Sequence, residues 1–343
     1  MMTFKQGQGQ DYYNYYQIYQ ETEFWSEYGI WSVILMRGDP AYSLINLLMI
    51  KLGIPYIVFA SIFSLLIMLI QYNFFKKECH CSSISLFIFY TTIFISYDCN
   101  AMRQGMAMAI ILGIGYPLIV RGKIKRFVFG CLIASTIHLS ALICLLIPFI
   151  INLKLSQQRT FLIIILSSIF ILCSSNLLNH LPLPGFMSNR LTAYQDSSAA
   201  KYLAIGVRLI DIIPILLITR KGYDTNKSLS QLKNILLFGF IIYSICSFND
   251  FIASRENIYF RMFEGLFLYQ ILFDSNFNKI KRTVFGLYLI LSFIIFPKDI
   301  LASMAQGEYR NCNLFTYPYF TVFDSNQTIA YYRTNFGFVD EQL

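Results

Sequence analysis

Apolar runs long enough to cross a lipid bilayer recur along this chain, and they constrain its fold more than any other feature. A helix needs about 20 apolar residues to cross the hydrocarbon core, and several runs here are about 17 to 22 residues long. Of the 343 residues, 56% are hydrophobic and 13% are charged, and a soluble domain carries roughly twice that share of charge. The sequence therefore predicts an all-α, polytopic integral membrane protein that forms one membrane domain over residues 1–343.

The positive charges group in short loops between the apolar runs. The formal net charge is +8, but this grouping is the pattern of cytoplasmic loops in membrane proteins. It does not indicate a nucleic-acid partner. Lys76-Lys77 and the loop 121–126 are examples, and both are predicted to lie in the cytoplasm.

The cysteines do not predict a metal centre. Eight are scattered along the chain, and Cys79-His80-Cys81 could form half of a metal site, but no second Cys/His pair follows at a suitable spacing. No metal and no cofactor are expected.

Charge placement predicts about eight spans. Residues 1–42 are polar and aromatic, without the apolar core of a signal peptide, and are predicted to lie outside, as is the tail 297–343. The predicted spans are 54–75, 83–97, 102–120, 161–178, 202–219, 235–248, 255–273 and 284–296.

The run 127–151 is predicted to be a re-entrant hairpin. A single crossing would place the basic residues of three later loops outside, against the charge rule. Each arm of a hairpin would have about 12 residues, which at 1.5 Å per residue reaches the bilayer midplane. The polar cluster Ser135-Thr136-Ile137-His138-Leu139-Ser140 lies at the middle of the run, so His138 is expected near the hairpin tip.

Several arginines are predicted near the outer face. Arg103 and Gln104 open the span 102–120, and Arg190, Arg255 and Arg261 are expected near the same face. Arginine is always charged and binds phosphate through two parallel hydrogen bonds, so a group of arginines favours an anionic ligand. The alternatives are that Arg103 extends to the water layer and that Arg261 pairs with Glu264, as Arg208 can pair with Asp211.

The order of several short motifs resembles the EpsG-type family of exopolysaccharide polymerases, relatives of the Wzy polymerases. The motifs are Asp11-Tyr12-Tyr13-Asn14-Tyr15, Asp39-Pro40-Ala41-Tyr42, Met102-Arg103-Gln104-Gly105-Met106-Ala107 and His138-Leu139-Ser140-Ala141. Ile137 replaces the usual Phe before the histidine. Family members usually have a membrane helix before the first motif, so the resemblance implies either a lost span or a true start upstream.

The resemblance implies a membrane glycosyltransferase with an architecture related to the GT-C fold, in the bacterial cytoplasmic membrane. Its substrate would be an undecaprenyl-pyrophosphate-linked oligosaccharide, joined into polysaccharide at the outer face. A flippase and a chain-length regulator are the expected protein partners. Arg103 and Arg261 would bind the pyrophosphate, assisted by Arg190 and Arg255.

The remaining roles follow from the same resemblance. Asp11 would act as the general base, with His138 as the second candidate or, alternatively, a packed structural histidine. Gln104, Tyr15 and Tyr194 are expected to contact substrate, because tyrosines can stack on sugar rings; anchoring at the membrane interface is the alternative. A polysaccharide ligase, a membrane acyltransferase and a lipid-linked oligosaccharide flippase remain open as other functions.

Overall fold

The computed structural model describes residues 5–6, 11–35, 38–80, 82–177, 198–220, 226–273, 280–301, 320–321 and 323–324. These residues are helical apart from connections and one antiparallel pair of two-residue strands, β1 (Lys5–Gln6) and β2 (Phe320–Thr321). The prediction of a helical membrane protein is confirmed.

Four helices in the described part of the chain are long and apolar enough to cross a membrane. They are α4 (Tyr56–Glu78), the continuous run α6 (Met102–Ile110), η3 (Ile111–Gly115) and α7 (Tyr116–Val120), α13 (Lys227–Cys246) and α16 (Lys281–Leu301). Shorter apolar helices cover Ser83–Asp98, Leu139–Ile150 and Gln157–Leu172. The count of about eight spans and the GT-C relation stay predictions.

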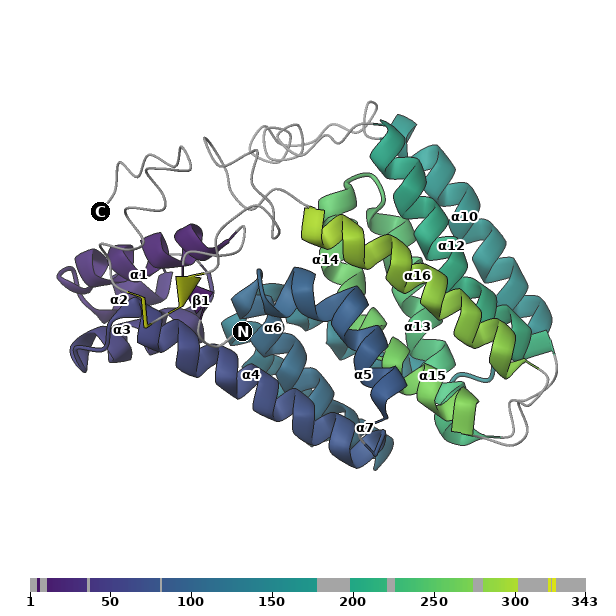
Figure 1. Cartoon of the computed structure of the whole chain (residues 1–343), viewed down its shortest axis with the longest axis horizontal. Helices are drawn as coiled ribbons and strands as arrows, with labels where there is room; N and C mark the ends of the chain where they lie inside the picture. Colours follow the sequence, from purple (N-terminus) through teal and green to yellow (C-terminus); the bar gives the residue numbers. More distant parts are fainter. Residues whose placement is uncertain are drawn as a thin grey trace.

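Three short helices, α1 (Tyr12–Ser26), α2 (Ile30–Leu35) and α3 (Pro40–Lys51), pack together beyond the start of α4 (Figure 1). The Tyr19 hydroxyl donates to the Ile54 carbonyl over 2.5 Å, which joins α1 to the turn before α4. The other helices are α5 (Ser83–Phe89), η2 (Tyr90–Asp98), α8 (Ile124–Ile137), η4 (Leu139–Leu146), α9 (Ile147–Ile150), α10 (Gln157–Leu177), α12 (Ser198–Arg220), α14 (Asp250–Arg261) and α15 (Glu264–Phe273).

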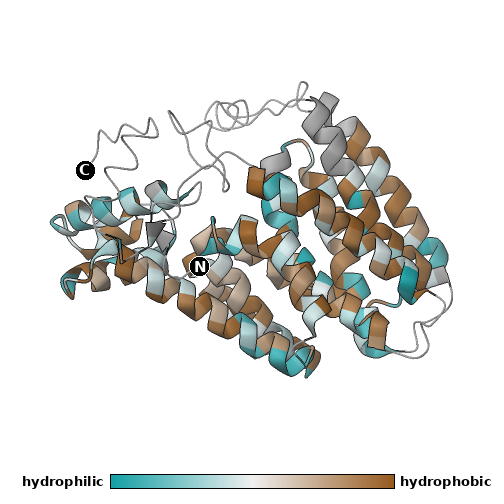
Figure 2. Cartoon of the chain, viewed as in Figure 1, coloured by the Kyte–Doolittle hydropathy of each residue, from teal (hydrophilic) through white to brown (hydrophobic). Residues whose placement is uncertain are grey.

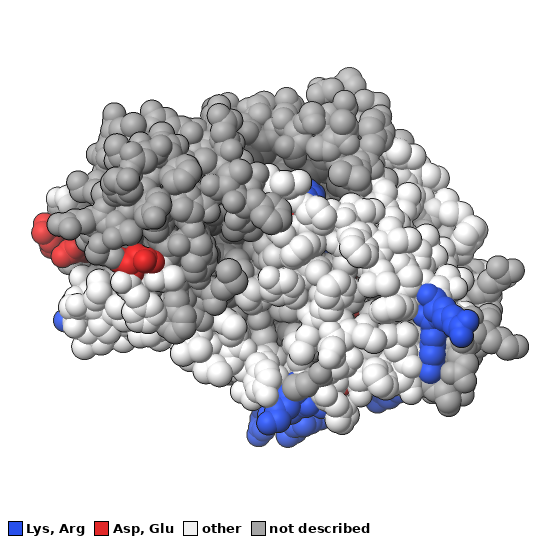
Figure 3. Space-filling view, in the orientation of Figure 1, with Lys and Arg blue, Asp and Glu red and all other residues white. Residues whose placement is uncertain are grey.

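Hydrophobic residues dominate the long helices, whereas α1 is mixed (Figure 2). Lysines and arginines are visible mainly along the lower edge and at the lower right of the molecule, and acidic side chains at its left end, over the α1–α3 region (Figure 3). We call the first the basic end and the second the outer end, after the side of the membrane predicted for residues 1–42. Interactions near the basic end include His80 Nδ1 with the Tyr269 hydroxyl, 2.9 Å apart, and Gln270 Nε2 donating to Ser228 Oγ over 2.6 Å.

The predicted fold-back over 127–151 is confirmed. α8 runs from the basic end to His138, whose backbone is extended (φ −149°, ψ 114°), and the chain then returns as η4, which packs against α8. The returning arm ends near the basic end, where Asn234 Nδ2 donates to the carbonyls of Ile150 and Ile151 over 3.2 and 3.3 Å. His138 is therefore at the tip, and the depth of this tip in a membrane stays a prediction.

The single helix predicted over 255–273 is wrong. The chain forms α14 and α15 instead, separated at Met262 and Phe263, where the Phe263 N–H donates to the Phe260 carbonyl over 3.3 Å in a tight turn. Neither glycine nor proline lies at the break, so the sequence carries no local signal for it.

Close packing of α15 against α5 makes Gly265 sensitive to substitution. A Cβ at Gly265 would lie 2.8 Å from the main-chain oxygen of Ser85, closer than real contacts allow. We expect Gly265→Ala to destabilise the protein by about 1–3 kcal/mol, because the two helices must separate. The unfolding temperature in detergent measures this. Gly130→Ala on α8 is the control, since its added Cβ meets no atom within 4 Å beyond its chain neighbours and its own helix backbone. Equal unfolding temperatures for the two variants would contradict the packing.

Candidate functional site

Arg103 lies at the outer end, where its side chain is held by an ion pair and two aromatic rings. It belongs to the first turn of α6, and its Nη1 pairs with the carboxylate of Asp39. Its guanidinium carbon lies 5.3 Å from the ring centre of Tyr15 and 5.6 Å from that of Tyr42. Cations are attracted to the faces of aromatic rings at such distances. The Arg103 side chain is 21% exposed, so a ligand can still reach it.

Asp39 joins three parts of the fold. It precedes α3, which begins at Pro40, a residue suited to the first helical position. One carboxylate oxygen pairs with Arg103, and Oδ1 accepts from the Leu139 N–H over 3.2 Å at the hairpin tip. Burial raises the pKa of the Asp39 carboxyl, and the neighbouring Arg103 opposes that rise. Asp39 was predicted only as part of a motif, without a role of its own.

The hairpin tip brings His138 beside this pair. Its Nδ1 is buried and has no hydrogen-bond partner among the described residues, and Arg103 and Arg255 both act on it electrostatically. Two residues further on, Ser140 Oγ donates to the Tyr259 hydroxyl over 3.2 Å, which joins the hairpin to α14.

A second arginine–aspartate pair lies at the same end. Asn249 caps α14 by accepting from the Ile252 N–H over 3.0 Å, and Arg255 follows on the second turn of that helix. Arg255 Nη2 lies 3.9 Å from Asp11 Oδ2, and these side chains are 35% and 26% exposed. The Gln104 side chain is buried and donates Nε2 to the Arg255 carbonyl over 2.8 Å. Gln104 therefore connects α6 to α14 rather than facing the surface.

We call these residues the outer cluster. It combines two guanidinium groups, two carboxylates, an imidazole and an aromatic ring from α1, α6, α14 and the residues directly before α1, α3 and η4. Guanidinium groups can bind phosphate, and carboxylates or imidazole can accept a proton. Its members are Asp11, Tyr15, Asp39, Arg103, His138 and Arg255.

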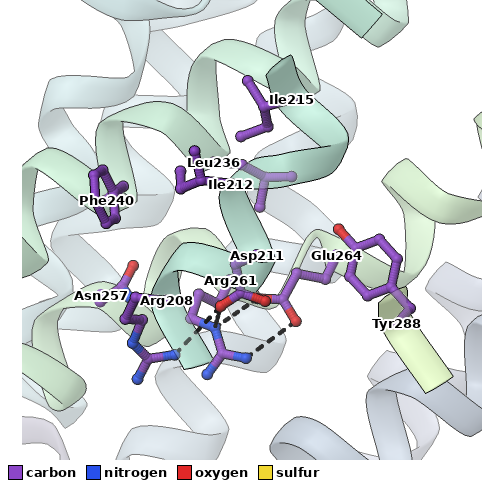
Figure 4. A pocket seen from close by; sticks show the side chains of 10 residues that line it. All are labelled: Arg208, Asp211, Ile212, Ile215, Leu236, Phe240, Asn257, Arg261, Glu264 and Tyr288. Carbon is purple, nitrogen blue, oxygen red and sulfur yellow. Dashed lines mark hydrogen bonds and ion pairs between the residues drawn. The ribbon is translucent and has the colours of Figure 1, made fainter. Parts of the chain in front are cut away.

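Arg261 contacts a different set of residues. Its Nε lies 2.5 Å from Glu264 Oε1 and 3.2 Å from Asp211 Oδ2. Arg208 Nη1 lies 3.6 Å from the same Asp211 oxygen, and its guanidinium carbon is 4.9 Å from the ring centre of Tyr243. We call Arg208, Asp211, Arg261 and Glu264 the buried charge cluster (Figure 4).

The positive and negative charges of the buried charge cluster compensate one another. Two arginines face two carboxylates around a small cavity that Asn257, Tyr288 and several apolar side chains also line. The Arg261 side chain is 7% exposed and that of Glu264 is 2% exposed. The alternative that Arg261 pairs with Glu264 is therefore what the structure shows, and Arg261 does not join the arginines of the outer cluster.

Two predicted contacts, Arg190 and Tyr194, lie outside the described residues. Within the described part of the chain, no group of three or more His, Cys, Asp or Glu side chains is placed to hold a metal ion.

Comparison with known proteins identifies the family of this chain. The model of the EpsG family matches residues 1–321. This chain belongs to the EpsG family. No curated protein and no solved structure matches it. The EpsG family is associated with polysaccharide polymerisation, and every member of the outer cluster lies within the matched residues.

Arg261 in this EpsG chain offers a test of the two-cluster arrangement. We expect Arg261→Ala to destabilise the protein by about 3–5 kcal/mol, because it leaves the buried carboxylate of Glu264 without its arginine and Asp211 with Arg208 alone. The yield of monodisperse protein and its unfolding temperature measure this, with Arg282→Ala, an exposed arginine of α16, as the control. Wild-type stability together with lost polysaccharide synthesis would instead place Arg261 among the ligand-binding residues.

Proposed function

We propose that this EpsG-family chain is a polysaccharide polymerase. It joins undecaprenyl-pyrophosphate-linked oligosaccharide repeats into capsular, exo- or O-antigen polysaccharide at the outer face of the bacterial cytoplasmic membrane. The observation that carries the proposal is Arg103, held by Asp39 and two tyrosine rings at the outer end of an apolar helix, with Arg255 and His138 close by. The proposal also includes about eight membrane spans, the re-entrant hairpin and a GT-C-like arrangement of the helices.

The reaction needs positive charge at one place and a proton acceptor at another. A hydroxyl of the acceptor sugar attacks the anomeric carbon of the donor repeat, forming the new glycosidic bond. The bond between that carbon and the pyrophosphate oxygen breaks, and undecaprenyl pyrophosphate leaves with the electron pair. Arg103 and Arg255 stabilise the charge that develops on the leaving group, as preorganised donors do in other transferases.

The proton of the attacking hydroxyl goes to a base of the outer cluster. Asp11 is the first candidate because its side chain is more exposed than that of Asp39 (26% against 8%). His138 is the second, since its Nδ1 has no partner among the described residues. Each guanidinium group has five N–H donors, so Arg103 and Arg255 can bind phosphate oxygens while keeping their carboxylate partners. Arg190 and Tyr194 stay predicted substrate contacts.

The host cell can test the function directly. The gene is deleted and complemented with the wild-type chain, and lipid-linked and surface glycans are separated by size. A polymerase predicts that the deletion accumulates single lipid-linked repeats on the outside and that the wild-type chain restores long polymer. Full-length polymer retained on lipid would instead indicate a ligase, and repeats trapped inside would indicate a flippase.

A further inference from the structure

The end of α1 and the turn after it carry exposed aromatic side chains that the proposed reaction does not use. Phe24, Trp25 and Tyr28 are 53%, 39% and 64% exposed, although large aromatics usually bury most of their surface. Their rings contact one another, with centroids 5.6 Å apart for Phe24–Trp25 and 5.8 Å apart for Trp25–Tyr28. The three side chains therefore form one continuous surface, which we call the aromatic platform.

The charges around the platform argue against a lipid surface as its partner. Residues 11–36 contain four acidic residues and no lysine or arginine, and Glu23 and Glu27 are exposed beside the platform. Helices that lie on membranes are typically rich in lysine and arginine on their polar face. Acidic side chains are visible at this end of the molecule in Figure 3.

The exposed surface of α4 provides a comparison within the same chain. It is aliphatic, with Ile62, Leu65, Leu66 and Leu69 each exposed by 41–47%, which is the composition expected for contact with lipid tails. The platform instead presents aromatic faces, and the exposed carboxylates of Glu23 and Glu27 and the amide of the exposed Gln20 are close to it along the chain. Aromatic faces can pack on the apolar faces of sugar rings, and carboxylates can accept hydrogen bonds from sugar hydroxyls.

The platform is connected to the outer cluster by a single helix. α1 begins directly after Asp11 and runs to Ser26. At 1.5 Å per residue, Trp25 lies about 21 Å along the helix axis from Asp11. A glycan whose reacting end lies at the outer cluster could therefore extend along α1 to the platform.

We propose that Phe24, Trp25 and Tyr28 form a binding site for the sugar rings of the growing polysaccharide. This inference rests on the proposed function, since it assigns the substrate class that the outer end holds during chain growth. The site binds glycan through ring stacking and hydroxyl–carboxylate hydrogen bonds, away from the reacting atoms.

Tryptophan fluorescence can test this site, because few tryptophans contribute to the signal. The chain has two tryptophans, Trp25 and Trp31, so Trp31→Phe leaves Trp25 as the single reporter. The variant chain is placed in lipid nanodiscs and titrated with short oligosaccharides released from the host's own polysaccharide. The site predicts a saturable change in Trp25 emission and little quenching when the lipid is exchanged for a brominated one. Quenching by brominated lipid without a response to oligosaccharide would overturn the proposal and assign the platform to the membrane interface.

Substitutions separate this site from the catalytic one. Phe24→Ala with Tyr28→Ala should weaken oligosaccharide binding about tenfold, because two of the three rings that stack on the glycan are lost. Phe293→Ala, an aromatic of α16 that is 73% exposed, is the matched control and should change nothing. Arg103→Ala should lose polymer synthesis and keep the oligosaccharide response. The two proposals can fail separately. If the chain does not polymerise repeats, the Trp25 emission still shows whether the platform binds oligosaccharide. If the chain polymerises repeats and the Trp25 emission does not change, only the proposed glycan site is overturned.

Discussion

Arg103→Ala is expected to lower the rate of polymer formation by about 10²–10³-fold, the cost of removing one charge-stabilising donor from an active site. Cells carrying the variant should accumulate single lipid-linked repeats on the outside of the membrane. The physical reason is that the Arg103 guanidinium stands fixed between Tyr15 and Tyr42 and partly open to ligand. Separation of lipid-linked glycans by size measures the effect.

Two further variants test whether the effect comes from the guanidinium group of Arg103. Arg103→Lys keeps the charge but loses the planar donor group, so we expect a smaller loss than for alanine. Arg282→Ala, an exposed arginine at the basic end, should leave the polymer unchanged. Unchanged long polymer in Arg103→Ala, with the variant present in the membrane, would mean that this arginine extends to the water layer without a role in the reaction.

Asp39→Ala is expected to have the second-largest effect. The substitution releases Arg103 and removes the acceptor of the Leu139 N–H at the hairpin tip. Breaking a mostly buried ion pair by removing one partner costs about 3–5 kcal/mol, so both the folded fraction and the activity per folded molecule should fall. Polymer yield normalised to the amount of membrane-inserted protein, together with the unfolding temperature, separates the two effects.

Asp39→Asn is the conservative partner of that variant. The amide oxygen can still accept from the Leu139 N–H, while the charge that opposes Arg103 is lost. We expect stability closer to wild type than for Asp39→Ala and an intermediate polymer yield. Wild-type polymer and wild-type stability in Asp39→Ala would contradict the role of Asp39 in holding Arg103 and the tip.

Charge and hydrophobicity predicted the path of the chain well where the signals are local. The long apolar runs gave the helices, and the basic loops predicted a fold-back over 127–151 with His138 at its tip, as found. The break after Arg261 could not be predicted, because Met262 and Phe263 are ordinary helix residues and neither glycine nor proline lies between α14 and α15.

The same limit applies to the candidate site. The sequence grouped Arg103 and Arg255 at one end, and the structure agrees. It also placed Arg261 with them, because nothing in the local pattern shows that Asp211, 50 residues earlier on α12, faces Arg261. Asp39 was given no role for the same reason, since its partners Arg103 and Leu139 are 64 and 100 residues away.

The most direct test of the central claim uses the purified chain in liposomes with undecaprenyl-pyrophosphate-linked repeats from the host as the sole substrate. Products are separated by size, and released undecaprenyl pyrophosphate is measured in the same sample. A polymerase with its site at the outer cluster predicts a ladder of repeats for the wild-type chain, one lipid pyrophosphate released for each bond formed, and neither product for Arg103→Ala. A ladder of equal length from Arg103→Ala, or no ladder from the folded wild-type chain, would contradict it.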